Sequence, residues 1–140
     1  MTNLAKGLAA SFAMLAVVAV LALVAGCRQA SSSGAFEPYR QISPEEALAL
    51  MESESDYIIL DVRTVREFAS GHIPNAINVP VETIGTTPPS ELPDLNQLIL
   101  VYCRSGNRSK KAAQKLAEMG YANIVEFGGI NAWPGEVTQG

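Results

Sequence analysis

Hydrophobic residues are distributed unevenly along the chain. Residues 8–25 form one long apolar run, rich in Ala, Val and Leu, with no charged side chain. From residue 37 onward, apolar residues occur in short groups separated by polar turns, and all fourteen acidic residues lie there. The first pattern is typical of a segment directed to a membrane, and the second is typical of a globular domain.

Four short apolar groups in the second part predict β-strands. The clearest is residues 98–102, which is uncharged and unbroken, as a central strand of a parallel sheet is. Residues 57–60 and 124–127 are rich in β-branched and aromatic side chains, and residues 76–79 form a weaker group.

Helical patterns alternate with these strands. Ser43 with Glu46, and Thr64 with Glu67, have the spacing of capping boxes, so two helices are predicted directly after these caps. A third, amphipathic helix is predicted over residues 110–119. Alternating strands and helices predict an α/β domain with a mostly parallel sheet that is covered by helices on both faces.

The start of the chain has the layout of a secretory signal. One positive side chain, Lys6, precedes the apolar run, which ends in Val24-Ala25-Gly26-Cys27. This ending resembles the bacterial lipoprotein signal, in which the chain is cut before the cysteine and the cysteine thiol is lipidated. The alternative is an uncleaved N-terminal anchor, because the run is long enough to span a bilayer.

The lipoprotein interpretation divides the chain into three parts. Residues 1–26 are the expected signal peptide, residues 27–37 are lipidated Cys27 and a flexible spacer, and residues 38–140 are the domain. Either interpretation places the domain outside the cytoplasm and attached to a membrane, in the periplasm or at the cell surface.

The composition excludes several classes of protein. A formal net charge of -4 and a pI near 4.9 argue against a nucleic-acid partner. Two cysteines and one histidine are too few for a Cys/His zinc site or a disulfide scaffold, and nothing requires a metal or an organic cofactor. With Cys27 lipidated, Cys103 has no partner cysteine, which argues against a dithiol oxidoreductase.

The segment Cys103-Arg-Ser-Gly-Asn-Arg-Ser109 follows the predicted central strand, where ligands bind in parallel sheets. Free N–H groups at the start of the next helix, a tight turn at Gly106, and the charges of Arg104 and Arg108 all favour an anion there. They also favour a thiolate at Cys103, so we expect a nucleophile in an anion-binding loop. The alternative is a structural cysteine, but its polar neighbours are unsuited to burial.

Loop length separates two enzyme classes. Cysteine phosphatases need a cysteine, five residues and then an arginine, so that the loop wraps a phosphate. Here only four residues separate Cys103 from Arg108, and Tyr102 replaces the usual histidine before the cysteine. A shorter loop suits a smaller electrophile, such as a sulfur atom.

Four segments of the domain occur in a fixed order, at residues 61–68, 71–80, 101–109 and 128–133. Together they resemble the rhodanese (thiosulfate sulfurtransferase) family in its single-domain form. The resemblance implies a five-stranded α/β domain and a two-step reaction. The thiolate of Cys103 takes the outer sulfur of a small anionic donor such as thiosulfate, and the persulfide passes it to an acceptor such as cyanide or a thiol.

The resemblance also implies roles for other residues. Backbone N–H groups of the loop would stabilise the persulfide, and Arg104 or Arg108 would hold the anionic end of the donor. The loop residues assigned to substrate binding are Arg104, Ser105, Gly106, Asn107, Arg108 and Ser109. Asp61 and Arg63 are expected to support the loop, paired with each other or with loop residues.

The sequence also suggests roles for His72 and Asn75. His72 is either a general base or a residue that fixes the turn before Ile73-Pro74, and the second fits a thiolate that needs no base. Asn75 stands where the family usually has glycine, and asparagine also tolerates a positive φ.

Two functions share the Cys103 loop and are not separated by sequence. One is a sulfurtransferase that turns over small acceptors, and the other is a membrane-tethered carrier that hands sulfane sulfur to a partner protein. A fold kept only for protein interaction is a third, which the intact Cys103 weakens.

Overall fold

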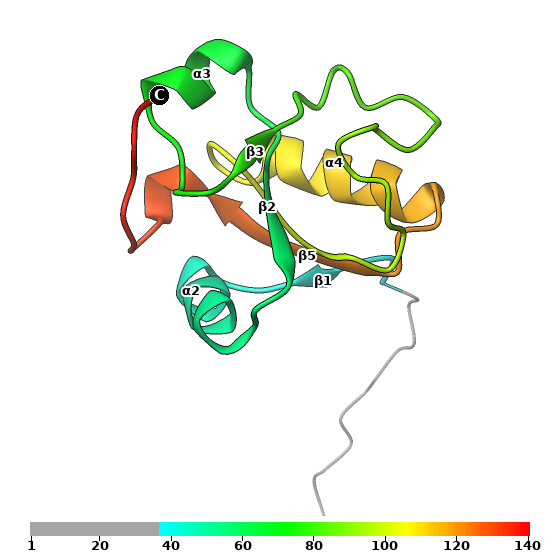
Figure 1. Cartoon of the computed structure of the whole chain (residues 1–140), viewed down its shortest axis with the longest axis horizontal. Helices are drawn as coiled ribbons and strands as arrows, with labels where there is room; N and C mark the ends of the chain where they lie inside the picture. Colours follow the sequence, from blue (N-terminus) through cyan, green and yellow to red (C-terminus); the bar gives the residue numbers. More distant parts are fainter. Residues whose placement is uncertain (1–36) are drawn as a thin grey trace, which may run out of the picture. The chain divides into compact units, whose positions relative to one another are not determined.

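The computed structural model describes residues 37–140, in which five strands form one sheet (Figure 1). The strands are β1 (Arg40–Gln41), β2 (Tyr57–Asp61), β3 (Ile77–Asn78), β4 (Leu98–Cys103) and β5 (Asn123–Gly129). Their order is β1-β5-β4-β2-β3, and all neighbouring pairs are parallel. The predicted α/β fold with a five-stranded, mostly parallel sheet is confirmed.

Helices cover both faces of this sheet. They are α2 (Pro44–Ser53), α3 (Val65–Ser70) and α4 (Asn107–Glu118), and a 3-10 turn (Ile130–Ala132) follows β5. α4 packs on one face and α2 on the other (Figure 1). This arrangement places the carboxyl ends of β2, β4 and β5 close to α3 and to the start of α4.

The predicted membrane anchor lies outside the described residues. This applies to the signal peptide of residues 1–26, to Cys27 and to residues 28–36 of the spacer. Within residues 37–140, no helix is both long and apolar enough to cross a bilayer.

Both predicted capping boxes form. The Ser43 hydroxyl accepts the Glu46 N–H at 3.2 Å, and the Glu46 carboxylate accepts the Ser43 N–H at 2.7 Å. Thr64 and Glu67 repeat the arrangement at 3.2 and 3.1 Å. These bonds satisfy N–H groups that the first helical turn leaves free, so α2 and α3 begin directly after their caps.

The third helix begins earlier than the predicted range of residues 110–119. α4 starts at Asn107, because Gly106 adopts a φ of 106° and turns the chain directly from β4 into the helix. Arg108 and Ser109 therefore lie in the first turn of α4 and not in an open loop. The free N–H groups of that turn come next to Cys103.

Alternation of side chains along β4 divides the core into two layers. Ile99, Val101 and Cys103 belong to the layer between the sheet and α4. Leu100 and Tyr102 belong to the layer on the opposite face, which α2 covers. Cys103 thus ends β4 on the face that carries the start of α4.

The turn between α3 and β3 contains Asn75. Its φ is 65°, in the left-handed region that favours glycine. The prediction that asparagine tolerates this conformation in place of glycine is confirmed.

Candidate active site

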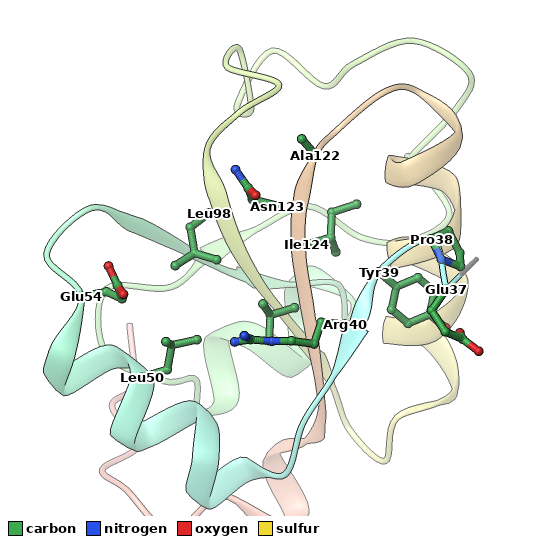
Figure 2. A pocket seen from close by; sticks show the side chains of 11 residues that line it. Glu37, Pro38, Tyr39, Arg40, Leu50, Glu54, Leu98, Ala122, Asn123 and Ile124 are labelled. Atoms are coloured by element: carbon green, nitrogen blue, oxygen red, sulfur yellow. The ribbon is translucent and has the colours of Figure 1, made fainter. Parts of the chain in front are cut away.

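Two of the hollows in the described surface differ in their chemistry. One, of about 620 Å³, lies at the amino ends of β4 and β5 beside α2 (Figure 2). Its charged side chains are Glu37, Arg40 and Glu54, and its lining includes no cysteine, histidine or serine. The other, of about 270 Å³, is lined by Arg104 and by Arg66 of α3. Of the predicted anion-binding residues, Arg104 lines this second hollow, which lies at the carboxyl end of the sheet.

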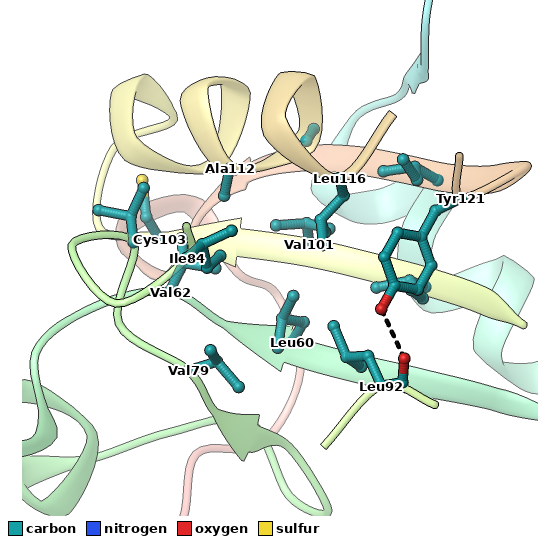
Figure 3. Close-up of a cluster of buried hydrophobic side chains, with 14 residues drawn as sticks. Leu60, Val62, Val79, Ile84, Leu92, Val101, Cys103, Ala112, Leu116 and Tyr121 are labelled. Carbon is teal, nitrogen blue, oxygen red and sulfur yellow. Dashed lines mark hydrogen bonds between the residues drawn. The ribbon is translucent and has the colours of Figure 1, made fainter. Parts of the chain in front are cut away.

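Cys103 lies under the start of α4 at this end of the sheet (Figure 3). The residue is 1% exposed, and its Sγ accepts a hydrogen bond from the Gly106 N–H at 3.1 Å. The positive φ of Gly106 aims this N–H back at the sulfur. The thiol is held at the N-terminus of the helix, where the helix dipole favours negative charge.

Two opposing effects act on the Cys103 thiol. Burial raises its pKa, whereas the Ser109 hydroxyl and the N–H groups of Ser109, Gly106 and Ser105 lower it. The donors prevail, so the pKa of Cys103 is below its ordinary value. A larger thiolate fraction favours nucleophilic chemistry at Cys103, which is the role that the sequence predicts for it.

The Ser109 side chain is buried between the loop and β5. Its Oγ lies 2.5 Å from Glu126 Oε1, 2.9 Å from the Gly106 carbonyl oxygen and 3.2 Å from the Gly128 carbonyl oxygen. Sequence reasoning did not identify Glu126, although a glutamate inside the apolar run of residues 124–127 is a signal for a buried polar role.

The backbone of β5 supports the loop directly. A Cβ at Gly129 would overlap the carbonyl group of Arg104, so glycine is required there. The Arg104 carbonyl oxygen also accepts the Asn131 N–H at 3.3 Å. The loop therefore packs directly against the end of β5. This contact helps to position the loop N–H groups relative to the Cys103 sulfur.

The remaining loop side chains differ in what they can reach. Arg104 is exposed and lines the 270 Å³ hollow. Ser105 and Asn107 are also exposed, and Asn107 is the first residue of α4. Arg104 is thus the loop arginine that faces the hollow, and its side chain makes no hydrogen bond within residues 37–140.

Arg108 is bound to a carboxylate on the neighbouring helix. Its Nη1 and Nη2 each donate to Glu67 of α3 at 2.7 Å. The hydrogen bonds from Arg108 hold the pKa of Glu67 down to about 2, against the opposing effect of burial. Arg108 ties α4 to α3, so the geometry favours Arg104 as the arginine that meets a ligand. No sequence signal connects these residues, which are 41 positions apart.

Glu67→Gln is expected to remove part of the acid sensitivity of folding. The folded-state pKa of Glu67 lies below its ordinary value, so its stabilisation is present above about pH 4.3 and is lost as the pH falls toward 2. Between pH 6 and pH 3, the free energy of unfolding should fall by roughly 1 kcal/mol less in the variant than in the unchanged chain. Urea denaturation at the two pH values measures this difference.

Glu46→Gln is the matched control. Glu46 fills the same capping position in α2, and it forms no ion pair within residues 37–140. Its replacement removes the capping contact without removing an ion pair, so it should change the pH dependence of unfolding less than Glu67→Gln does. An equal effect of both substitutions would assign the acid sensitivity to helix capping and not to Arg108.

Asp61 and Arg63 pair with each other, which is one of the two arrangements that the sequence left open. The Arg63 Nη2 lies 2.6 Å from Asp61 Oδ2 and also donates to the Gly71 carbonyl oxygen at 2.7 Å. Asn78 donates to the carbonyl oxygens of both residues. This buried pair stabilises the carboxyl end of β2 and the turn after α3.

His72 has a structural environment. Its Nδ1 lies 2.9 Å from the Phe68 carbonyl oxygen, which only accepts, so this nitrogen carries a hydrogen. Its ring stacks on Phe68 at 3.7 Å, and its backbone pairs with Thr138 at 2.8 and 2.9 Å. These contacts favour the interpretation that His72 fixes the turn.

Within residues 37–140, no cluster of His, Cys, Asp or Glu side chains has the arrangement of a metal site.

Comparison with known proteins agrees with this geometry. The family model for the rhodanese-like domain matches residues 43–136. The thiosulfate sulfurtransferase GlpE of Pseudomonas entomophila is 34% identical over 107 residues, covering 73% of this chain and 94% of the relative. A solved E. coli rhodanese with anions is 30% identical, with a TM-score of 0.56, and the match covers 60% of this chain and 99% of that one.

A longer relative contains only a partial match. The adenylyltransferase and sulfurtransferase UBA4 of Candida albicans is 36% identical over 104 residues, and the match covers 69% of this chain but only 24% of that protein. This chain therefore spans about a quarter of the length of that relative. Because the family model spans most of the described fold and includes the Cys103 loop, this chain belongs to the rhodanese-like domain family.

Proposed function

We propose that this protein is a thiosulfate sulfurtransferase that carries sulfur as a persulfide on Cys103. The thiolate attacks the outer sulfur of thiosulfate, the sulfur–sulfur bond of the donor breaks, and its electron pair leaves with sulfite. A thiophilic acceptor such as cyanide then attacks the terminal sulfur of the persulfide. Thiocyanate leaves, and the Cys103 thiolate is regenerated.

One observation carries the proposal. The Cys103 thiol has a lowered pKa in a loop whose N–H groups point at the sulfur, beside an exposed arginine. The same N–H groups can stabilise the negative charge of a persulfide. The Pseudomonas relative is named a thiosulfate sulfurtransferase, which supports the choice of donor.

The test uses the full chain purified in mild detergent. We would incubate it with thiosulfate, determine the intact mass, then add cyanide and follow thiocyanate. A gain of one sulfur atom that leaves as thiocyanate supports the enzyme. A stable adduct with no turnover would favour the alternative, a membrane-tethered carrier that passes sulfur to a partner protein. No adduct on a reduced thiol would exclude thiosulfate as the donor.

Arg104→Ala is expected to weaken donor binding. Loss of one charged hydrogen-bonding group should raise the KM for thiosulfate about tenfold, with little change in kcat. Steady-state kinetics at fixed ionic strength measure both constants. Arg40→Ala removes an exposed arginine at the other hollow and should leave both constants unchanged. An unaltered KM in Arg104→Ala would show that another group holds the anionic end.

We also propose that residues 1–26 are removed and that Cys27 carries a lipid. The protein should then enter the detergent phase in a phase-partition assay, and its first peptide should start at a modified Cys27. Cys27→Ala should retain residues 1–26 and lack the added lipid mass. If the unchanged chain itself retains residues 1–26 with a free Cys27 thiol, the uncleaved anchor is correct and the lipoprotein proposal is not.

A further inference from the structure

Glu126 is an ionisable residue in the interior of the domain. It lies in β5 between Val125 and Phe127 and is 2% exposed. Burying a carboxyl group is unfavourable unless hydrogen bonds compensate for lost water. The contacts of Glu126 therefore indicate what this residue does.

Those contacts lead to the active-site loop. Glu126 Oε1 accepts the Gly128 N–H at 2.8 Å and lies 2.5 Å from Ser109 Oγ. Neither ion pair within residues 37–140 includes Glu126, so no arginine or lysine neutralises it there. The negative charge of Glu126 is thus balanced by donors that belong to the loop and to its support.

The titratable groups around Glu126 are few. Tyr39, before β1, has a raised pKa, first from burial and then from the charges of Glu126 and Glu37. In β4, Cys103 lies on the same face of the sheet as Val101, which is the register partner of Glu126, and α4 presents the uncharged Ser109 to Glu126. The pairing of β1 with β5 also brings Arg40 beside Val125, but its side chain is exposed.

Glu126 and Cys103 compete for one hydrogen. The Ser109 hydroxyl lowers the pKa of Cys103 when it donates to the thiolate, but it has a single hydrogen and also donates to the Glu126 carboxylate. The Gly106 and Gly128 carbonyl oxygens, at 2.9 and 3.2 Å, are uncharged and therefore weaker acceptors of the same hydrogen. A separation of 2.5 Å is typical of a charge-assisted bond from a hydroxyl to a carboxylate. When the hydroxyl serves Glu126, the thiolate keeps only the backbone N–H groups as donors.

We infer that Glu126 is a positioning residue that takes the hydrogen of the Ser109 hydroxyl and so limits how strongly the loop stabilises the Cys103 thiolate. A thiolate that is stabilised too strongly is a weaker nucleophile. The benefit to sulfur transfer rests on the proposed function, whereas the competition itself does not. The two are therefore tested by different measurements.

The first measurement reads the thiol alone. Iodoacetamide alkylation of the peptide that carries Cys103 is followed against pH in the full chain and in Glu126→Gln. The amide keeps an acceptor for the Gly128 N–H but lacks the charge, so the Ser109 hydroxyl turns to the sulfur. The midpoint should move to lower pH by roughly one unit. Glu118→Gln, at an exposed glutamate of α4, should not move it.

The second measurement asks whether Ser109 transmits the effect. On a Ser109→Ala background, Glu126→Gln should move the midpoint by less than about a third of its shift in the unchanged chain. An equal shift on both backgrounds would overturn the inference, since Glu126 would then act without the hydroxyl. An unchanged or alkaline-shifted midpoint in Glu126→Gln would also overturn it.

A purely structural role of Glu126 predicts a different result. In that case Glu126→Gln lowers the thermal midpoint of unfolding but does not move the alkylation midpoint of Cys103. If Glu126→Gln does not fold, the single variant Ser109→Ala, with Glu126 retained, tests the inference instead. The inference expects its midpoint to move by well under one pH unit, and an alkaline shift of about one unit or more would show that the hydroxyl already serves the thiolate.

A third measurement, the rate of sulfur uptake from thiosulfate, tests the part of the inference that depends on the proposed function. At a pH above both midpoints, Glu126→Gln should take sulfur from thiosulfate about threefold more slowly, because nucleophilicity falls with the basicity of the thiolate. An equal or faster rate would refute the benefit to transfer. If thiosulfate loads neither protein, the donor assignment fails while the alkylation result still decides the role of Glu126.

Discussion

Cys103→Ser is expected to abolish sulfur transfer. Thiocyanate formation should fall by at least about a thousandfold, and thiosulfate should leave no sulfur adduct on the chain. A serine hydroxyl stays protonated at neutral pH, and its oxygen attacks sulfur poorly even where N–H groups favour the anion. Intact mass and a thiocyanate assay measure the two losses.

The variant should fold, which makes its loss of activity interpretable. The Gly106 N–H that donates to Cys103 Sγ can donate to a serine oxygen, so the buried hydroxyl keeps a partner. The thermal midpoint of unfolding should therefore change by only a few degrees. Cys27→Ser is the control for the other cysteine and should retain full turnover. Turnover that persists in Cys103→Ser would show that the sulfur is not carried at this position.

The elements that the sequence predicts well are those that local interactions determine. The capping boxes at Ser43 and Thr64 involve partners three residues away, so their spacing is visible in one sequence. The strand of residues 98–102 is buried on both faces, which leaves an unbroken apolar run. In these cases local preference and tertiary packing agree.

The prediction was incomplete where a distant contact decides the conformation. β1 has only two residues, both exposed, and exists because its backbone pairs with β5. α4 starts three residues before the predicted residue 110, since Gly106 turns the chain next to the sheet. A two-residue strand and a glycine-initiated helix have no periodic pattern to reveal them.

In the candidate site, too, residues that are neighbours in sequence were predicted, whereas contacts between distant residues were not. Cys103, Gly106 and Arg104 were identifiable because they are adjacent in sequence and combine a nucleophile, a flexible turn and a positive charge. Either Arg104 or Arg108 was expected to hold the donor, and the partner of Arg108, Glu67, lies on another helix and becomes visible only in the fold. Glu126 was missed for the same reason, as its partner Ser109 is 17 positions away.

Gly129 marks the closest approach between β5 and the active-site loop. Its φ of -147° is ordinary extended backbone, so alanine meets no conformational penalty there. The obstacle is space, because a Cβ would overlap the Arg104 carbonyl and crowd the Ser105 nitrogen. These are backbone atoms, which cannot move aside as the end of a side chain can. Either the loop or β5 must shift.

Gly129→Ala is therefore expected to lower both stability and activity. Overpacking against backbone should reduce the free energy of unfolding by roughly 1–3 kcal/mol. Displacement of the Ser105 and Gly106 N–H groups should raise the pKa of Cys103 toward its ordinary value, because these donors lower it in the unchanged chain. Sulfur uptake per folded molecule at pH 7 should fall about threefold for each unit by which the pKa rises, because the tenfold smaller thiolate fraction is partly offset by the greater nucleophilicity of a more basic thiolate.

Two other glycines separate the causes of this effect. Gly85→Ala adds a methyl group where no atom lies within 4 Å and should change stability by less than about 0.5 kcal/mol. Gly128→Ala also has open space but a φ of 86°, so it should cost about 1 kcal/mol from backbone strain alone. Neither substitution adds an overlap with the loop.

If Gly129→Ala changes stability and the alkylation midpoint of Cys103 as little as Gly85→Ala does, then β5 does not determine the positions of the loop donors. If it exceeds Gly128→Ala in both measurements, contact with β5 keeps those donors aimed at the sulfur.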